Sequence, residues 1–375
     1  MAGEGLQLDD TNRLDRIRRA LAAEGFAAVC LCPGDDTRYA VGFSPPYDER
    51  LDFLIVGEAG AALVVPGVNA TAARTRLAAA GVEVLDWADD QGPQAALRHA
   101  LGVATGSETA GALLVSDDAR YDHARRLADV LQPERVELAS RVMRGLRLIK
   151  DEDEIRRMRI SAGLADQAME AGFRAIRRGM TETELSDAIR AAFVEAGADQ
   201  ASFMMAAYGP GAAEPHHHPG QARIADGPIT LDIGCRGAGY ASDMTRMAYV
   251  GTPDDEFLQV HEIVYQARMA GERAAQIGAP CSAVDRAARA VIEAAGYGQY
   301  FVHRTGHGIG VSTHEPPSMM AGDETPLAPG MAFSIEPGIY LPGRFGVRIE
   351  DVAVMHADGP EILSHLSQQP RVVAG

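Results

Sequence analysis

The chain is poor in basic residues relative to acidic ones. Its 375 residues include 52 Asp and Glu against 35 Lys and Arg, which gives a formal net charge of −17. Proteins that bind duplex nucleic acid normally present a basic stripe, because phosphate contacts supply much of their affinity. Here the arginines are scattered at helical spacing, so we expect neither nucleic acid nor an anionic membrane as a partner.

Cysteine and long apolar runs are also scarce. The four cysteines do not have zinc-finger spacing, and nothing in their number suggests a disulfide framework. Cys30 and Cys32 lie in a short apolar run and are expected to be small buried side chains. The longest apolar stretch, Leu51–Val68, is interrupted by glycine, glutamate and proline and is too polar to span a bilayer. The first residues show no cationic, apolar leader, so we expect a cytoplasmic protein.

The length and the pattern of the chain predict two domains. A composition of 46% hydrophobic and 23% charged residues is typical of globular proteins, and 375 residues exceed one ordinary domain. Helical and strand-like segments alternate over residues 12–135, which predicts a small α/β domain over 1–139. The second predicted domain, 140–375, is of the α+β class. It opens with a long helix whose acidic first turn, Asp151–Glu154, complements the helix dipole.

The second domain contains a weak internal repeat. A helix predicted over 184–196 recurs over 283–295, and each copy is followed by a β-rich stretch with two acidic residues. Two similar halves that face each other would line one central cavity from both sides.

The acidic residues of the repeat flank glycine-rich turns. Asp232 and Asp243 lie on either side of one turn, and Glu336 and Glu350 are centred on Gly343. We therefore expect each pair to face across a hairpin. Because like charges directly opposite each other destabilise a sheet, these carboxylates need cations between them.

A histidine completes this set. His307 lies between glycines in the segment 306–310, and glycine lets the backbone bring the imidazole close to the acids. Four carboxylates and one imidazole suit manganese, cobalt or zinc. Four negative charges balance two divalent ions, which can share a water and lower its pKa towards neutrality. The pattern therefore predicts a metallohydrolase with the ligands Asp232, Asp243, His307, Glu336 and Glu350.

The motifs around these ligands resemble those of the proline-specific metallopeptidases of the pita-bread fold, the prolidase and aminopeptidase P family. The matching elements are Asp232, Asp243 in Asp-Met-Thr-Arg, His307 in His-Gly-Ile-Gly, Glu336 in Glu-Pro-Gly-Ile-Tyr and Glu350 in Arg-Ile-Glu-Asp. The resemblance covers most of the chain. It implies a creatinase/prolidase-like N-terminal domain, a pita-bread (creatinase/aminopeptidase-like) catalytic domain and a homodimer. It also implies two metal ions bridged by Asp243 and Glu350, with manganese favoured over cobalt or zinc.

The same resemblance assigns catalytic roles. Glu336 would carry the proton of the attacking water to the leaving proline nitrogen. His314, seven residues after His307, would stabilise the oxyanion. His216 would lie near the scissile bond, and His217 and His218 are the alternatives because the stretch that leads to the first ligand is one residue short.

Other residues are expected around the ligands. Arg348 would hold Glu350 and Asp351 from behind. Tyr340 and His218 are the further residues expected in contact with the substrate or with the ligands.

The resemblance implies hydrolysis of Xaa-Pro bonds in a proline-containing di- or oligopeptide. An Xaa-Pro dipeptidase is favoured over an Xaa-Pro aminopeptidase that acts on longer peptides. Some prolidases grip the dipeptide carboxylate with an arginine shortly after the second histidine, but here His314 is followed by Glu315 and two prolines. Arg304, Arg344 or a residue of the small domain would have to take this role.

More distant alternatives remain within the same fold. Creatinase-like enzymes dispense with the metal ligands, and methionine aminopeptidases usually lack such an N-terminal domain. A non-catalytic peptide-binding pita-bread module is a further alternative, and the intact set of ligand acids counts against it.

Overall fold

A computed structural model describes residues 11–374 of the chain. They form two compact units that divide between Arg147 and Leu148. The sequence analysis placed this boundary at 139/140, before helix α6 (Ser140–Leu148), nearly all of which belongs to the first unit. No helix within 11–374 is both long and apolar enough to cross a membrane. The expected absence of a leader concerns residues 1–10, which lie outside the described residues.

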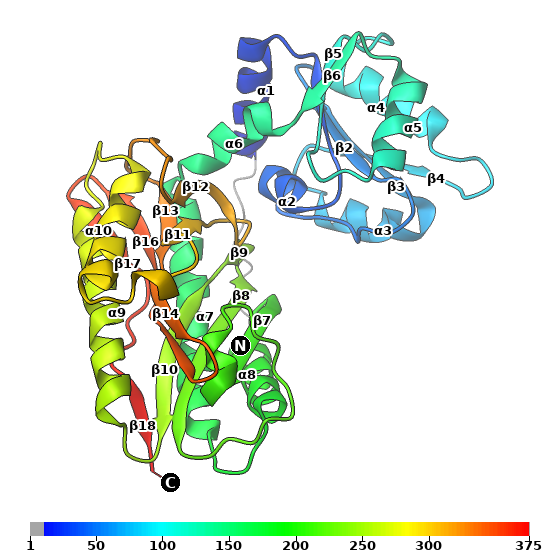
Figure 1. Cartoon of the computed structure of the whole chain (residues 1–375). Coiled ribbons are helices and arrows are strands. Elements are labelled where there is room, and N and C mark those ends of the chain that lie inside the picture. The colour runs from blue at the N-terminus through cyan, green and yellow to red at the C-terminus, as the bar shows by residue number, and fades with distance from the viewer. Residues whose placement is uncertain (1–10, 375) are drawn as a thin grey trace. The chain divides into compact units, whose positions relative to one another are not determined.

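The first unit is built on one mixed six-stranded sheet with the order β4-β3-β2-β1-β5-β6 (Figure 1). Strands β2 and β3 form the predicted antiparallel hairpin, and β5 runs parallel to both β1 and β6. This alternation of strands and helices is the α/β architecture inferred from the sequence. The strands are β1 (Ala28–Leu31), β2 (Phe53–Gly57), β3 (Ala61–Pro66), β4 (Glu83–Trp87), β5 (Ala112–Val115) and β6 (Arg135–Leu138). The helices are α1 (Thr11–Glu24), α2 (Asp35–Val41), α3 (Gly67–Arg76), α4 (Gln94–Thr105) and α5 (Tyr121–Leu131).

The core of the first unit is formed by apolar side chains from the sheet and from α4 and α5. Phe53, Leu97 and Leu127 are fully buried in it. Cys30 and Cys32 pack in the same core, and burial raises the pKa of both thiols to about 12. They are therefore unreactive apolar side chains, as predicted.

The second unit contains two five-stranded sheets, one with the order β18-β10-β8-β7 and β9 paired to β8, the other with the order β12-β11-β13-β16-β17, and a two-stranded ribbon of β14 and β15. Helices α7 and α8 pack against β8 and β7 through residues such as Phe173, Ile189 and Leu231 (Figure 1). Helices α9 and α10 pack against each other, and α10 packs against the second sheet, where Val284 and Phe333 belong to one buried apolar cluster. Two helix pairs on two sheets match the internal repeat seen in the sequence.

The elements of the second unit have the following bounds. The helices are α7 (Glu152–Ala175), α8 (Glu182–Ala196), α9 (Asp255–Ala274) and α10 (Cys281–Ala294), with short 3-10 turns η1 (Gly209–Ala213) and η2 (Gly298–Tyr300). The strands of the first sheet are β7 (Gln200–Tyr208), β8 (Gly227–Gly237), β9 (Tyr240–Ala241), β10 (Met244–Val250) and β18 (Arg371–Val373). The remaining strands are β11 (Gly306–Gly308), β12 (Glu315–Met319), β13 (Ala332–Ile335), β14 (Gly338–Leu341), β15 (Phe345–Arg348), β16 (Asp351–His356) and β17 (Gly359–Ile362).

Helices α7 and α8 begin where local chemistry fixes them. Asp151 caps α7 and exchanges hydrogen bonds with Glu154, and Thr181 and Glu184 do the same for α8. Such reciprocal capping satisfies backbone donors that a helix start leaves free. The acidic start of α7 therefore has the structural explanation that the sequence suggested.

The first unit buries one carboxyl group that lacks partners. Asp52, directly before β2, is fully buried, and neither carboxylate oxygen has a hydrogen-bond partner among residues 11–374. Burial raises the pKa of Asp52 to about 8, with a smaller contribution from the charge of Asp48. Trp87, the single tryptophan of the chain, donates from Nε1 to the carbonyl oxygen of neighbouring Leu51 at 3.1 Å. Its fluorescence therefore reports on this part of the unit.

We predict that Asp52→Asn stabilises the first unit in a pH-dependent way. Below the ordinary pKa of 3.8 the carboxyl group is protonated in both states and the substitution has little effect. As the pH rises to about 8, the unfolded chain has lost this proton while the folded chain retains it, so the wild type progressively loses stability. Thermal unfolding followed by Trp87 fluorescence should show the variant melting several degrees higher at pH 8, with the difference vanishing towards pH 4. Exposed Asp90→Asn is the control, and equal melting of wild type and Asp52→Asn at pH 8 would contradict the prediction.

Candidate metal centre

One cavity of the second unit, with a volume of about 600 Å³, is lined by all five predicted metal ligands. Its walls also include the loop that carries the three consecutive histidines and the segment from His303 to His314. The structure therefore brings the five residues singled out from the sequence together in one cavity.

The first two carboxylates come from β8 and from the residue before β10. Asp232 has Met205 of β7 and Thr245 of β10 as its cross-strand neighbours. The prediction that Asp232 faces Asp243 directly is wrong, because the hairpin turns at Ala238 and Gly239 and is centred one residue later than expected. Both turn residues have positive φ, of 50° and 81°, as a two-residue hairpin turn requires. Asp243 consequently lies diagonal to Asp232, two residues before Thr245.

The second pair of carboxylates does face across a hairpin as predicted. Strands β13 and β16 pair in the same register as β14 and β15, and Gly343 lies at the turn. This register places Glu336 opposite Glu350, at the break between the two ladders. The backbone N–H of Glu350 donates to the carbonyl oxygen of Thr245 at 3.2 Å, which joins this hairpin to β10 and brings the two acidic pairs together.

His307 is held in β11 with one ring nitrogen free for a ligand. Its Nδ1 donates to the carbonyl oxygen of Gly308 at 3.1 Å, so Nε2 carries the lone pair. Nε2 lies 3.5 Å from Asp243 Oδ2 and 3.4 Å from Glu336 Oε1. Burial lowers the pKa of His307 to about 3, which keeps the imidazole neutral. The neighbouring glycines are needed for close backbone approach, since a Cβ at Gly306 would lie 1.9 Å from the carbonyl oxygen of Ser334.

The charges in this cavity fit bound divalent cations. Oδ1 of Asp232 is buried without a hydrogen-bond partner in the described part of the chain. Burial, and then repulsion from neighbouring carboxylates, raises the pKa of Asp243 and of Glu350 well above the usual range. Burial also raises the pKa of Glu336 to about 7. Carboxylate oxygens and a neutral imidazole that converge in this way are the donor set of a manganese-, cobalt- or zinc-type site.

The possible ligand atoms form three overlapping groups, within each of which the atoms lie no more than 4.8 Å apart. The groups are Asp232, Asp243 and Glu350; His307, Glu336 and Glu350; and Asp243, His307 and His314. The ring of His314 meets that of His307 edge-on, with centroids 4.1 Å apart at an angle of 86°. His314 is therefore at ligand distance as well as on the cavity wall, which the sequence did not indicate.

Arg348 lies behind the ligands, but its partners differ from those predicted. It donates to Asp232 Oδ2 at 2.5 Å, to Thr245 Oγ1 at 3.1 Å and to Tyr340 Oη at 2.8 Å. The hydroxyl of Thr245 in turn donates to Glu350 Oε2 at 2.7 Å. Arg348 therefore reaches Asp232 directly and Glu350 through Thr245, and it does not bind Asp351.

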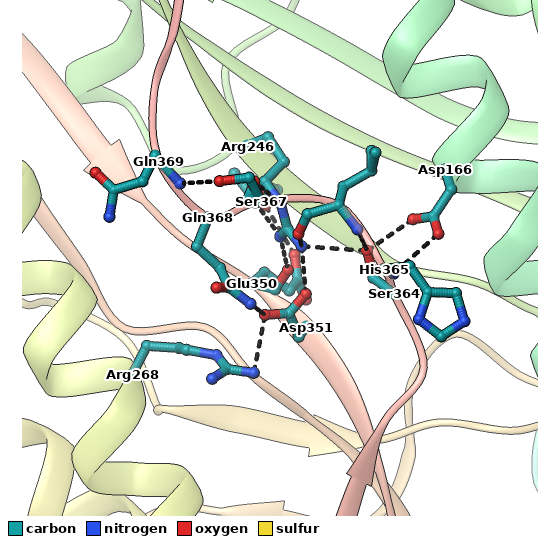
Figure 2. Close-up of polar contacts among 12 residues, drawn as sticks. Asp166, Arg246, Arg268, Glu350, Asp351, Ser364, His365, Ser367, Gln368 and Gln369 are labelled. Carbon is teal, nitrogen blue, oxygen red and sulfur yellow. Dashed lines mark hydrogen bonds and ion pairs between the residues drawn. The ribbon is translucent and has the colours of Figure 1, made fainter.

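Asp351 instead belongs to a separate buried charge cluster (Figure 2). It is fully buried and forms ion pairs with Arg246 and Arg268, which are also buried. Successive side chains of a strand point to opposite faces, so Asp351 points away from the cavity that Glu350 faces. Arg246 also donates from Nη1 to the carbonyl oxygen of Glu350 at 2.6 Å, and thereby fixes the backbone of this ligand.

The three consecutive histidines take different positions. His217 is bound by the buried carboxylate of Glu182, at 2.9 Å from Nε2 to Oε2. All three histidines line the cavity, but His216 and His218 are exposed whereas His217 is half-buried. His216 lies on the wall of the same cavity as His303 and His314. Of the three alternatives, the structure thus separates His217 from the other two.

Tyr340 and His303 extend the network behind Asp232. Tyr340 accepts from Arg348, and its hydroxyl donates to His303 Nε2 at 2.7 Å. His303 Nδ1 donates to the carbonyl oxygen of Arg304 at 2.7 Å, and burial lowers the pKa of His303 to about 4. No motif in the sequence pointed to His303. Thr245, in contrast, lies two residues after Asp243 and so shares its face of the strand, which makes it detectable in principle.

We predict that Thr245→Val weakens metal binding without unfolding the chain. The two side chains have similar shapes, but valine removes the donor to Glu350 and leaves Arg348 Nε without its acceptor. Loss of a partner that orients a ligand typically lowers metal affinity about 10- to 100-fold. Titration of the metal-free protein with Mn²⁺ should measure this loss. Thr230→Val, at a buried position of the neighbouring strand β8, is the matched control, and equal affinities of wild type and Thr245→Val would contradict the prediction.

Comparison with known proteins agrees with this geometry. Residues 156–357 match the model of metallopeptidase family M24, and residues 13–149 match the creatinase/prolidase N-terminal domain. The chain is 39% identical over 351 residues to the probable dipeptidase PepE of Mycobacterium tuberculosis. The aligned region covers 92% of this chain and 92% of that protein. It is 40% identical over 231 residues to an Xaa-Pro dipeptidase of Lactobacillus delbrueckii, 61% of this chain and 63% of that protein.

A similar solved structure is that of a prolidase from Thermococcus sibiricus. The two chains are 32% identical, superpose with a TM-score of 0.90, and the match covers 98% of this chain and 100% of that one. The predicted combination of a small α/β domain with an α+β pita-bread domain is thereby confirmed. The chain belongs to metallopeptidase family M24.

Proposed function

We propose that this protein is a dinuclear metal-dependent Xaa-Pro dipeptidase. The observation that carries the proposal is the convergence of four carboxylates and the neutral His307 in one buried cavity. The names of its relatives, a dipeptidase, an Xaa-Pro dipeptidase and a prolidase, support the same reaction. A non-catalytic module would not need to bury so many mutually repelling acids.

Two ions are supported by the overlap of the ligand groups. Asp243, Glu350 and His307 each belong to two of the three groups, and of these only the two carboxylates have two oxygens with which to bridge a pair of ions. Asp232 would then complete one site, and His307 with Glu336 the other. Bound there, two divalent ions would supply a water nucleophile at neutral pH and polarise the scissile carbonyl. Manganese is our first choice of metal, with cobalt and zinc as the alternatives.

Glu336 is suited to move the proton. Its pKa of about 7 lets the same carboxylate accept a proton from the attacking water and release it to the proline nitrogen. Ser334 Oγ donates to Glu336 Oε1 at 3.3 Å and keeps the carboxylate directed at the cavity. Because the leaving group is a secondary amine, proton delivery is an essential part of the reaction.

His314 and His216 are suited to stabilise the substrate. Burial, and then the charge of Arg304, lowers the pKa of His314, so its imidazole is neutral and donates one hydrogen bond to the developing oxyanion. His216 lies on the same wall of the cavity and would contact the residues that flank the scissile bond.

Arg304 is our choice for the residue that binds the free carboxylate of a dipeptide. It lines the cavity, and after burial its charge is a further cause of the lowered pKa of His307 and His314, while it offsets part of the rise in the pKa of Glu336. Its one side-chain bond within the described residues, from Nη1 to Ser318 Oγ at 3.2 Å, leaves the rest of the guanidinium for a ligand. Arg344, the other candidate from the sequence, is about half exposed, pairs with Glu256 and does not line the cavity.

We predict that Asp243→Asn abolishes hydrolysis of Ala-Pro while the chain stays folded. The asparagine removes a charge that bridging would need, so turnover should fall at least about 100-fold. The metal-free variant should melt higher than the metal-free wild type, because one source of carboxylate repulsion is gone. A dipeptide hydrolysis assay with added Mn²⁺, with and without chelator, measures the first effect. Asp255→Asn on the surface of α9 is the control, and full turnover by Asp243→Asn would refute the assignment.

We predict that Arg304→Met raises the KM for Ala-Pro about 10- to 100-fold, as expected for loss of one charged hydrogen bond. The KM for Ala-Pro amide, which lacks the carboxylate, should stay unchanged. Arg344→Met is the matched control and should affect neither substrate. An equal effect of Arg304→Met on both substrates would exclude the carboxylate role. The tripeptide Ala-Pro-Ala tests the alternative function, since an Xaa-Pro aminopeptidase would cleave it as well as the dipeptide.

A further inference from the structure

Lys150 is the single lysine of the sequence, and it is buried. Its Nζ lies 2.8 Å from Glu315 Oε1, and the two side chains are only 1% and 4% exposed. A buried ion pair is a poor means of stabilising a fold, because desolvation offsets most of the attraction. Every other permanently charged basic side chain of this protein is an arginine. The presence of a lysine at this one buried position therefore needs a more specific explanation than fold stability.

The space around the pair suits lysine and excludes arginine. A Cβ added at Gly310 would lie 2.6 Å from Glu315 Oε1 and 2.9 Å from Lys150 Cε. The backbone of Gly310 is therefore packed directly against both members of the pair. A compact ammonium fits there, whereas the broad planar guanidinium of arginine needs more room.

Lys150 is anchored to the framework of the second unit. Its backbone N–H donates to the carbonyl oxygen of Gly330 at 2.8 Å, and it directly precedes Asp151, the capping residue of α7. The ammonium is thus a fixed point against which a neighbouring loop can be held.

The loop held in this way is 309–314, which ends in His314. Glu315 directly follows His314 and pairs with Gly308 of β11, so it closes the loop. Its Oε2 accepts from the backbone N–H of Ser312 at 3.4 Å, within the loop itself. The carbonyl oxygen of Gly310 accepts from the N–H of Ala241 at 2.8 Å. Glu315 is therefore the link between the fixed ammonium and the loop.

The His314 ring depends on this backbone for its position. In the described part of the chain no hydrogen bond orients it, and its ring contact is the edge-on one with His307. It is also partly exposed at the cavity wall. A small shift of the loop would move the imidazole relative to the substrate, and such displacements are costly for catalysis.

We propose that Lys150 is a positioning residue for catalysis: through Glu315 it fixes the loop 309–314 and thereby the imidazole of His314. Lys150 itself does not line the cavity and does not touch the substrate. The inference rests on the proposed peptidase function for its kinetic consequences, but its structural content, the orientation of His314, can be measured without activity.

A double-mutant cycle tests the inference by kinetics. Lys150→Met should lower kcat for Ala-Pro at least about 10-fold, with KM and bound metal nearly unchanged, since the loss lies in the transition state. In a His314→Ala background the same substitution should change kcat less than about two-fold, because the two residues act as a unit. If the two effects multiply instead, the proposal is overturned.

Nuclear magnetic resonance tests it independently of activity. In the metal-free protein labelled with ¹⁵N-histidine, the His314 ring signal is identified by its loss in His314→Ala. Lys150→Met should shift or broaden this signal and leave that of exposed His99 unchanged. An unchanged His314 signal in Lys150→Met overturns the inference even if activity falls. If wild type cleaves no dipeptide with any of the three metals, the proposed function fails, and this experiment still decides the role of Lys150.

Further variants keep the test informative if Lys150→Met folds poorly. Glu315→Gln removes the pair from the other side and should reproduce both the kinetic loss and the altered His314 signal. Lys150→Arg retains the charge but not the fit, so it should rescue the fold without restoring kcat. Arg159→Met, which breaks the bidentate pair between Arg159 of α7 and Glu361 of β17, is the matched control and should change neither readout. Wild-type kinetics and an unchanged His314 signal in Glu315→Gln would also overturn the proposal.

Discussion

Four carboxylates of the second unit lie close together in one cavity, where they repel one another and are poorly solvated. They are Asp232, Asp243, Glu336 and Glu350. Burial and this repulsion together raise the pKa of Asp243 and Glu350, and burial raises that of Glu336. Divalent cations relieve both effects at once, since they replace lost solvation and neutralise the charge. The same electrostatic arrangement makes a water reactive near neutral pH, so the requirement for metal and the capacity for hydrolysis have one physical origin.

The rest of the second unit keeps these groups from moving apart. Each acidic pair lies on its own antiparallel arrangement of strands, and the hydrogen bond between Glu350 and Thr245 joins the two. Arg348 faces the cavity side of this junction, and Arg246 with Arg268 holds Asp351 on the other side (Figure 2). Buried arginines on both faces of one short segment restrict it strongly, and metal ligands depend on such support for their orientation.

The histidines of the site are controlled by different means. His307 is fixed by backbone and burial, and His303 by a chain of hydrogen bonds through Tyr340. His314 has neither, and its position follows from the loop that Glu315 closes. In this site the candidate metal ligands are held rigidly, whereas the position of His314 is set by residues outside the cavity. Lysine serves this purpose because its charge is compact enough to fit beneath Gly310.

The sequence by itself determined which carboxylates and which imidazole are candidate ligands and where the second hairpin turns, because both depend on short segments. Turn residues around Gly343 fix the register that places Glu336 opposite Glu350. For the first hairpin the same reasoning was one residue off, since the turn used Ala238 with positive φ, a conformation rare for alanine. Only the tertiary structure decided that Thr245 meets Glu350, that Arg348 binds Asp232, that His217 pairs with Glu182 and that Arg304 lines the cavity. Those contacts join elements far apart in the chain, and packing rather than local chemistry selects them.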